Sequence, residues 1–478
     1  MIKGTLPEKV QMERIGFLIH LIDAGYSKEL LDGISMYCQE KQMQLVVFPA
    51  HTLDWPFGKY GYQDSVLLEF IKNYKLDGLI IEAGTQCSFC GKEQFEKAFI
   101  NVMRPLPMVT FAVGFDGIPL VQGDNGHGLE ALVEHLISVH SCKKFMLVTG
   151  PSENPDSIIR ENSVKTVLKN HNIELQPDSI IRGNFFGQST VSLLKAYLDE
   201  HKKLDFDAIV CFNDIMALSI IHFLNAQGIR VPDDIIVTGF DDSFVSSFDL
   251  PTLTTVKTSL APQGYATAKK IHELIQHKKA EPYEEYSTVA LYRQSCGCIK
   301  EDDFSFNAYD EQMRKISWGK EFKRLRERRG LFLEGDFARI RDIVSVLLTV
   351  KDYFEFMNAL KMAFTALEIN KAAVVLYEKK TEHLKNAEFA VPEKAKLIYA
   401  FDADTDFKIT EAVPFNTKEG FLPFNNFDNA VSAFMLKPLF FCENQLGYIY
   451  FNTGSFSGSV YDLLCMQISN AVVSLKLN

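Results

Sequence analysis

The chain has 478 residues, too many for one hydrophobic core, and this length predicts about three folding units. With 47% hydrophobic and 23% charged residues, its composition is that of an ordinary globular protein. The formal net charge of −11 argues against a protein that coats nucleic acid or anionic lipid through its overall field.

The N-terminal segment and the cysteine count predict a cytoplasmic protein. Residues 1–9 contain no apolar stretch of the kind found in secretory signals, and no uncharged run approaches the ~18–20 residues needed to cross a bilayer. The nine cysteines are too few for a disulfide scaffold in a chain of this length, and their odd number leaves a free thiol. We therefore expect reduced thiols and no membrane partner.

Short apolar runs alternate with amphipathic segments over residues 15–295. The runs show no polar alternation, which is typical of strands buried on both faces of a parallel sheet, and they lie at 15–19, 45–48, 78–81, 108–111, 145–148, 208–211 and 235–238. Helical spacing of apolar residues predicts helices at 27–40, 126–139, 157–170, 187–200 and 214–227. This pattern predicts a doubly wound α/β fold that binds ligands at the carboxyl ends of its strands.

The pattern changes near residue 300. A polar linker at 301–307 precedes a charged helix expected at 310–329. A second, smaller α/β unit follows, with helices expected at 337–348, 354–367 and 460–475 and strands at 372–377, 434–441 and 446–451. Glu443 and Asn444 stand between two apolar runs and predict a tight hairpin.

An ordered set of motifs in the first 300 residues resembles the effector domains of the LacI family. The motifs are IGFLIHLIDAGYSKELLDGI at 15–34, LDGLII at 76–81, GDN at 123–125, CFNDIMAL at 211–218, VPDDIIVTGFDD at 231–242 and LPTLTTV at 250–256. The resemblance implies two lobes, like those of periplasmic binding proteins, that close on a small-molecule effector.

The same resemblance places nine side chains around a ligand: Asp23, Tyr26, Ser27, Asp124, Arg160, Phe185, Asn213, Asp241 and Thr258. Carboxylates and amides suit vicinal hydroxyl groups, arginine supplies a fixed fork of donors, and an aromatic face stacks on a ring. We expect Arg160 and Asp241 to hold the ligand from opposite sides of the cleft.

Several of these side chains have structural alternatives. Asp214 and Asp242 are expected to be helix caps or turn residues, and the same role is open for Asn213 and Asp241, although their strand-end positions favour the ligand. The arginine of the set could also be a solvated helix residue. For Phe185 the alternative is core packing, and a second phenylalanine beside it leaves the register of the pair open.

The chain also departs from the LacI repressors. Only 14 residues precede the first predicted strand, so we expect no N-terminal helix-turn-helix and no direct DNA binding. Residues 295–298, SCGC, resemble the end of LacI-type sensor regions that are followed by GGDEF, histidine-kinase or AraC-type output modules. Cys296 and Cys298 alone, without a partner pair, make a poor zinc site, and we expect no metal. Cys87 and Cys90 have the spacing of a redox pair but lack a thioredoxin-like context, so we expect no redox function for them.

Residues 437–451, KPLFFCENQLGYIYF, followed by a long closing helix, resemble part of a GAF domain. The chain is therefore divided into a ligand-binding domain at 1–299, a linker with a signalling helix at 300–335 and a GAF-like domain at 336–478. Asp402, Asp404 and Asp406 do not form a calcium loop, because Phe407 stands where glycine is needed and Val413 where glutamate is needed.

No catalytic motif is found, and no cofactor or enzymatic activity is expected. The sequence predicts a sensor of a sugar or related metabolite, acting as a homodimer through its own regulatory domain and an output module or partner protein. The basic stretch 320–329 is interpreted as a relay helix, since acidic residues interrupt it. The alternative is a LacI-related transcription regulator that contacts DNA by another surface or through an output module.

Overall fold

The structure is a computed structural model of the whole chain. It describes residues 12–22, 26–56, 58–247, 249–299, 340–341, 343–385, 387–403, 407–409, 411–423, 433–453 and 458–477. Asp23, the linker expected after residue 299 and the helix expected at 310–329 lie outside the described residues. None of the helices in the described part combines the length and apolarity needed to span a membrane.

The first lobe is a parallel sheet with helices on both faces. Its strand order is β11-β5-β4-β3-β1-β2, with bounds Tyr283–Tyr286, Leu120–Gly123, Met108–Phe111, Gly78–Glu82, Arg14–Ile19 and Gln44–Pro49. Helices α1 (Tyr26–Glu40) and α10 (Leu260–Ile275) cover one face. Helix α2 (Val66–Asn73) and the short helices α3 (Ala83–Gln86), α4 (Gly91–Phe95) and α5 (Asn101–Met103) lie toward the other.

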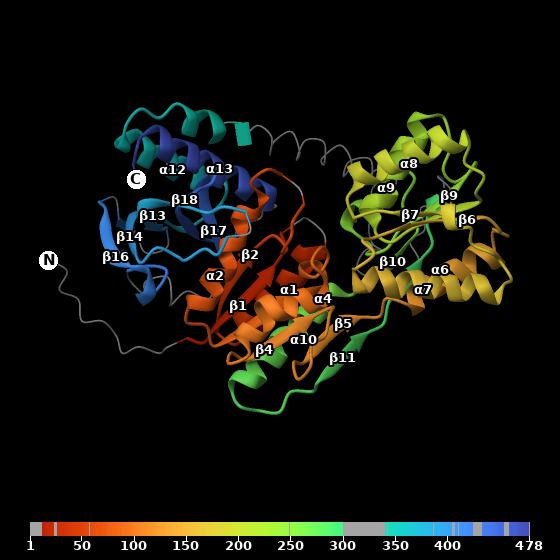
Figure 1. Cartoon of the computed structure of the whole chain (residues 1–478), viewed down its shortest axis with the longest axis horizontal. Coiled ribbons are helices and arrows are strands. Elements are labelled where there is room, and N and C mark those ends of the chain that lie inside the picture. Colours follow the sequence, from red (N-terminus) through yellow and green to blue (C-terminus); the bar gives the residue numbers. More distant parts are fainter. Residues whose placement is uncertain are drawn as a thin grey trace, which may run out of the picture.

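The second lobe has its own four-stranded parallel sheet in the order β7-β6-β8-β9. These strands are Ile180–Arg182, Phe145–Thr149, Ala208–Cys211 and Ile236–Thr238, and the helices are α6 (His127–Ser138), α7 (Pro155–Asn170), α8 (Gly187–His201) and α9 (Asp214–Ala226). Strands β10 (Thr255–Lys257) and β12 (Val289–Leu291) form a two-stranded ladder. The chain passes between the lobes three times, after β5, after β10 and after β11 (Figure 1). The predicted two-lobed α/β architecture is confirmed.

The C-terminal part is an antiparallel sheet flanked by two long helices. Its order is β17-β18-β13-β14-β15, with β16 pairing β14. The strands are Ala433–Phe441, Asn444–Asn452, Lys371–Glu382, Lys394–Asp402, Phe407–Ile409 and Val413–Asn416, and the helices are α12 (Tyr353–Ala366) and α13 (Gly458–Ser474). The hairpin expected beside Glu443 is present, since Phe441 pairs with Asn444. The sequence analysis did not predict β14, β15 and β16.

The two sheets of the left-hand body in Figure 1 are joined into one. Strand β2 of the first lobe pairs in parallel with β17, with Val46 opposite Phe434 and Val47 opposite Met435. The result is a single 12-stranded sheet, and side chains from both parts share the same two hydrophobic clusters. Pairing protects the edge of β2, which is buried along its whole length.

Candidate functional site

Buried polar side chains without hydrogen-bond partners gather where the strands of the first lobe end. His20 follows β1, His51 and Thr52 follow β2, and Gln86 ends α3. Both ring nitrogens of His20, Nδ1 of His51, Oγ1 of Thr52 and Oε1 of Gln86 find no partner among the described residues. Leaving buried polar atoms unpaired is costly, so such a group marks a place where a ligand or water supplies the missing hydrogen bonds.

Aromatic rings surround these polar atoms. The Trp55 indole stacks on His51 at a centroid distance of 4.8 Å and an angle of 8°, and it lies 4.6 Å from His20. Phe186, from the second lobe, meets Trp55 edge-on at 5.6 Å. Burial lowers the pKa of His20 to about 3, so its ring is neutral at neutral pH and can both donate and accept a hydrogen bond.

A group of ionisable side chains from both lobes lies beside α1. Burial raises the pKa of the Tyr26 hydroxyl well above its ordinary value. Three carboxylates raise it further and one guanidinium opposes them; these groups are Glu82, Asp156, Asp241 and Arg160. Burial also raises the pKa of Glu82 to about 7, although hydrogen bonds from Thr85 oppose that shift. The structure therefore places three acidic groups and a single guanidinium close to one tyrosine.

Asn125 links two of these charges at the first crossover between the lobes. Its Nδ2 donates to Oδ1 of Asp156 at 2.9 Å, and its Oδ1 accepts from Nε of Arg160 at 2.9 Å. The Arg160 guanidinium lies 3.6 Å above the Phe240 ring and donates through Nη1 to the Phe212 carbonyl. Its Nη2 group makes no hydrogen bond among the described residues, so this donor remains available to a ligand.

The lobes touch each other across this site. Nδ2 of Asn154, at the start of α7, donates to the Gly84 carbonyl at 3.2 Å and to Ser88 Oγ at 3.1 Å. The Asn154 side chain also caps α7 by accepting from Ser157 N at 2.9 Å. One residue therefore fixes the orientation of a helix in the second lobe and holds that helix against the first lobe.

The structure brings together Tyr26, Arg160 and Asp241 from the predicted set. The expectation that Arg160 and Asp241 lie on opposite sides of the cleft is wrong. Arg160 lies on α7 and Asp241 follows β9, so both belong to the second lobe and face Tyr26 and Glu82 of the first. The two residues belong to different elements, as expected, but both elements lie in the second lobe.

At two predicted positions the following residue reaches the site instead. The Asp124 carboxylate accepts from the Gly126 backbone N–H at 2.8 Å and contacts the His127 ring, so it binds the start of α6. Its neighbour Asn125 is the residue that contacts Asp156 and Arg160. Phe185 has a left-handed backbone (φ 68°). Its ring packs so closely on Gly150 that a Cβ added to Gly150 would lie 2.1 Å from Cζ of Phe185. Phe186 is the ring that meets Trp55.

The remaining predicted residues lie at element ends. Asn213 caps α9 by accepting from Met216 N and donates to the Phe185 carbonyl at 3.0 Å. Ser27 is buried in the first turn of α1, and Thr258 donates to the Asp241 carbonyl at 3.4 Å. The structure brings these three near the site but does not show a ligand role for them.

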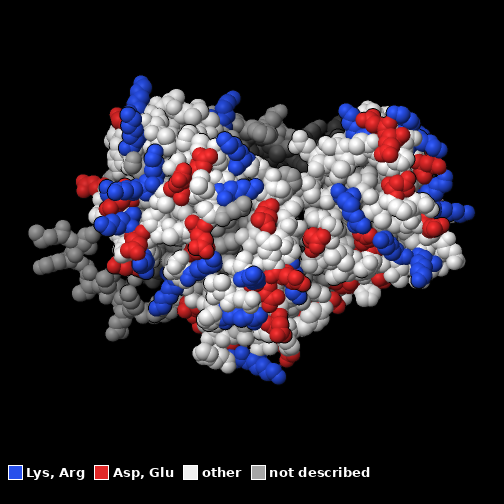
Figure 2. All heavy atoms as spheres, viewed as in Figure 1, with Lys and Arg blue, Asp and Glu red and all other residues white. Residues whose placement is uncertain are grey.

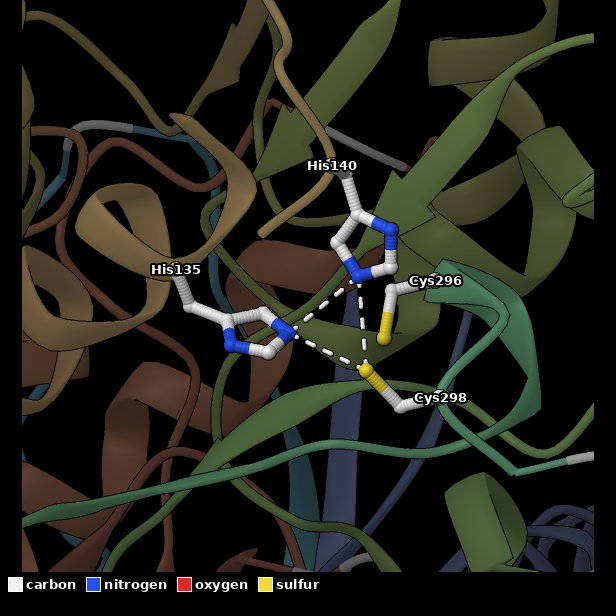
Figure 3. Close-up of side chains that lie close together, drawn as sticks. All are labelled: His135, His140, Cys296 and Cys298. Atoms are coloured by element: carbon white, nitrogen blue, oxygen red, sulfur yellow. Dashed lines mark hydrogen bonds between the residues drawn. The ribbon is translucent and has the colours of Figure 1, made fainter. Parts of the chain in front are cut away.

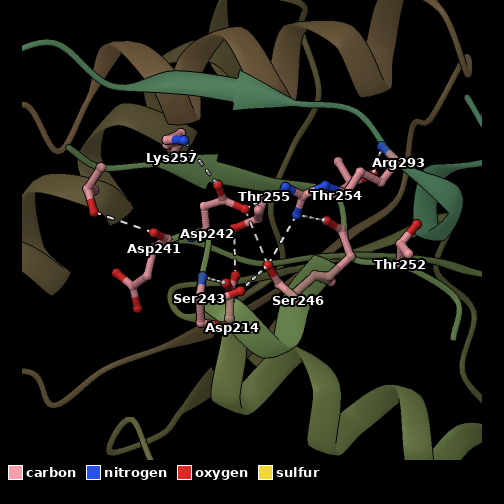
Figure 4. A network of polar contacts seen from close by, with 12 residues as sticks. Asp214, Asp241, Asp242, Ser243, Ser246, Thr252, Thr254, Thr255, Lys257 and Arg293 are labelled. Atoms are coloured by element: carbon pink, nitrogen blue, oxygen red, sulfur yellow. Dashed lines mark hydrogen bonds and ion pairs between the residues drawn. The ribbon is translucent and has the colours of Figure 1, made fainter. Parts of the chain in front are cut away.

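Asp214 and Asp242 make structural contacts, although the cap of α9 is Asn213 and not Asp214. Asp214 accepts from Thr255 Oγ1 at 2.5 Å and from the Ser243 backbone N–H at 2.6 Å. Asp242 pairs with Arg293 at 2.6 Å (Figure 4). Arg293 also donates to the Leu253 carbonyl at 3.0 Å. The Asp241 carboxylate points away from this network (Figure 4). These contacts tie the last segment of the ligand-binding domain to the turn that carries Asp241.

The sequence analysis missed His20, His51, Trp55, Glu82 and Asp156. The first four follow or end strands of the first lobe, so the rule that ligands bind at strand ends pointed to them. No such rule selects Asp156, which lies in the first turn of α7.

A hollow of about 850 Å³ lies between α2 and loops of the C-terminal part, beside Tyr74, Phe421 and Tyr448. Its buried Tyr448 hydroxyl already donates to the Phe421 carbonyl at 2.6 Å. The lobe interface, in contrast, contains several buried polar atoms that find no partner in the part of the chain that the structure describes. We therefore place the candidate ligand site between the lobes.

Comparison with known proteins identifies the class of this domain. Residues 133–296 match the family of periplasmic binding protein-like domains. The two-lobed region has the fold of periplasmic binding proteins and is similar to the corresponding region of LacI-family regulators.

Among individual relatives, the transcriptional repressor PurR of Haemophilus influenzae is 25% identical over 278 residues, covering 58% of this chain and 78% of PurR. The ribose operon repressor of the same organism is 22% identical over 284 residues, covering 59% of this chain and 79% of the repressor. The structure of a CelR–cellobiose complex superposes with a TM-score of 0.51 at 20% identity, covering 60% of this chain and 86% of CelR. CcpA of Lactococcus lactis gives 0.50 at 18% identity, covering 59% of this chain and 99% of CcpA.

Proposed function

We propose that this chain is a cytoplasmic sensor that binds a small polyhydroxylated molecule, a sugar or a related metabolite, between its lobes and passes the binding signal to a GAF-like regulatory domain. The observation that carries the proposal is the set of partnerless buried polar atoms beside Trp55, at a place where two lobes meet. The relatives are regulators rather than enzymes, which supports a binding function.

The composition of the site favours a polyhydroxylated ligand. Tryptophan and histidine rings offer flat apolar faces, while neutral histidines, an amide and carboxylates offer hydrogen bonds in several directions. Asp156 and Asp241 outnumber Arg160 there, and Glu82 adds partial negative charge because its pKa is about 7, so an anionic ligand would meet net repulsion. A neutral sugar satisfies the acceptors without adding charge.

The shared sheet supports a direct route for the signal. The Gly458 N–H, at the start of α13, donates to the Ile22 carbonyl at 2.6 Å, three residues after β1 ends. Buried Lys437 of β17 lies between Asp64 of the first lobe, at 3.7 Å, and Asp462 of α13, at 2.5 Å. Asp64 also pairs with His51 in the candidate site at 3.3 Å. A ligand that moves His51 therefore acts on α13 through two side chains.

The test begins with a thermal-shift screen of sugars, nucleosides and related metabolites, followed by calorimetry on any stabilising compound. A specific ligand raises stability by RT ln(1 + [L]/Kd). We expect Asp156→Asn to weaken binding at least tenfold, because a charge-assisted hydrogen bond contributes about 1.5–3 kcal/mol. Asp178→Asn, at an exposed position of the same lobe, is the matched control. Wild-type affinity in Asp156→Asn would contradict this site.

A second candidate function is transcription regulation by DNA contact through another surface or a partner module, because the relatives are repressors. On the face shown in Figure 2, acidic and basic residues are interspersed, which does not favour a nucleic-acid surface there. DNA binding across a salt series separates the two functions: a steep loss of affinity with salt supports DNA contact. The expected homodimer is tested by light scattering at micromolar concentration.

A further inference from the structure

Four potential metal ligands from two distant segments meet on the second lobe. His135 lies in the last turn of α6 and His140 follows that helix, while Cys296 and Cys298 end the ligand-binding domain (Figure 3). One ligand atom from each residue lies within 4.8 Å of all the others. Nε2 of His135 and Nε2 of His140 are 3.1 and 3.3 Å from Cys298 Sγ and 3.2 Å from each other.

These distances come close to the dimensions of a tetrahedral zinc site, with three contacts of 3.1, 3.2 and 3.3 Å and the Cys296 thiol within 4.8 Å of the other ligand atoms. Zinc binds imidazole nitrogen at about 2.0–2.1 Å and thiolate at about 2.3 Å, so tetrahedral ligand atoms are roughly 3.3–3.8 Å apart. The two imidazoles and the two thiols converge on one point in Figure 3. A Cys₂His₂ set is a common structural zinc site.

Local structure holds the ligands in place. Gly297, between the cysteines, has a φ of 84°, which a side chain would strain, and this turn brings both thiols to the same side. The His135 ring stacks on Tyr292 at a centroid distance of 3.8 Å and an angle of 20°. Cys296 is buried whereas Cys298 is exposed, so an ion can enter from solvent.

We propose that His135, His140, Cys296 and Cys298 form a structural site for one zinc ion. Binding displaces the two thiol protons to solvent and forms two Zn–S and two Zn–N bonds. Sequence spacing argued against metal because the cysteines lacked a partner pair, and the fold supplies that pair from the last turn of α6 and the segment that follows it. The ion fixes the end of the ligand-binding domain to the second lobe, at the point where the chain leaves toward the C-terminal part.

The experiment uses the full chain, expressed with zinc in the medium and purified without chelator, with metal content measured by plasma mass spectrometry. We expect about one zinc per chain. The variants Cys298→Ser and His140→Asn should each lose most of this zinc, while Cys442→Ser and His171→Asn, at half-buried and exposed positions elsewhere, should retain it. Far-ultraviolet circular dichroism checks that every variant is folded.

Cobalt provides a second measurement that does not depend on the zinc content of the purified protein. Added Co²⁺ should give the strong visible bands of a tetrahedral site and a thiolate charge-transfer band, both weakened in Cys298→Ser. Zinc below one tenth of the chain concentration together with a weak octahedral cobalt spectrum would overturn the proposal. The same zinc content in Cys298→Ser and the wild-type chain would also overturn it.

Discussion

The two lobes are built from similar strand–helix units but differ in what borders their sheets. The sheet of the second lobe contains four strands, and in the described part of the chain no strand of another domain pairs with it. The sheet of the first lobe continues through β2 and β17 into the C-terminal part and contains 12 strands. One lobe is therefore a separate body on three connecting segments, and the other is part of a larger body (Figure 1).

This difference indicates which part would move as a unit in the proposed lobe closure. Lobe closure of the hinge type rotates a rigid unit about a few connecting residues, and packed sheets do not bend continuously. The second lobe is such a unit, whereas the first lobe and the C-terminal part share one core. Inward movement of the second lobe would therefore act on a body that already includes the C-terminal part.

The largest expected effect comes from breaking the shared sheet. Phe434 of β17 is fully buried opposite Val46 of β2 and stacks on Tyr450 at 4.8 Å. Phe434→Ala should lower the free energy of unfolding by about 3–5 kcal/mol. Because the core is shared, hydrogen exchange should accelerate both at 433–441 and at 44–49. Normal protection at 44–49 in this variant would mean that the two parts fold independently.

A matched variant in the second lobe sharpens this comparison. Phe212 is equally buried, but it belongs to the core of the second lobe. Phe212→Ala should destabilise by a similar amount and accelerate exchange in β6 and β8, while 44–49 and 433–441 remain protected. Simultaneous loss of protection in all regions would contradict the division into two bodies.

The central strands of both lobes could be predicted because strands buried on two faces produce uninterrupted apolar runs, whereas the outer strands β5, β7, β10, β11 and β12 were not predicted. The predicted strand 108–111 has the observed bounds, and 45–48 differs from β2 by one residue at each end. The same runs do not identify pairing partners, since hydrophobicity shows that a strand is buried but not beside which strand. The β2–β17 junction was therefore not predictable. Strands β14 to β16 alternate or are short, which weakens their signal.

The candidate site was also predictable only in part, because a sequence locates a residue along the chain but does not show where its side chain points. Family position located Tyr26, Arg160 and Asp241, which the structure brings together. It could not show which of two neighbouring residues faces the cleft, because a backbone turn such as the one at Phe185 reverses the side-chain direction. The role of His20 could not be predicted without knowledge of packing, because the residue stands out only through ring nitrogens that are buried and find no partner among the described residues.

A smaller effect is a pH dependence specific to the first lobe. His20 is neutral in the folded chain at neutral pH because burial lowers its pKa from 6.5 to about 3. Below pH 6.5 the unfolded chain takes up this proton and the folded chain does not, so stability falls as the pH drops from 6.5 toward 3. The slope from this residue is about 1.4 kcal/mol per pH unit.

Urea unfolding of the wild-type chain and of His20→Phe, measured from pH 7 to about pH 4, tests this dependence. Phenylalanine keeps a ring beside His51 and Trp55 but does not titrate. The wild-type chain should lose more stability than the variant on acidification, with the difference growing below pH 6.5. Parallel pH profiles would show that His20 is accessible to protons in the folded chain.

The smallest effect concerns the contact between the lobes. Asn154 caps α7 through its oxygen and holds Gly84 and Ser88 through its nitrogen. Serine can keep the cap but is too short to cross the cleft, whereas alanine does neither. Asn154→Ser should retain the stability of the second lobe, and Asn154→Ala should lose about 1 kcal/mol of it. Both variants should lose the cross-cleft hydrogen bonds, which contribute about 0.5–1.5 kcal/mol each.

Hydrogen exchange separates the two roles of Asn154. Faster exchange at 84–88 in both variants, with faster exchange at the start of α7 only in Asn154→Ala, is the expected pattern. Small-angle scattering should show a larger radius of gyration for both, because the second lobe separates from the larger body when it is no longer held there. If Asn154→Ser leaves exchange at 84–88 and the radius unchanged, other contacts such as Trp55 with Phe186 hold the lobes together. The aromatic contact would then be the one that a ligand must rearrange.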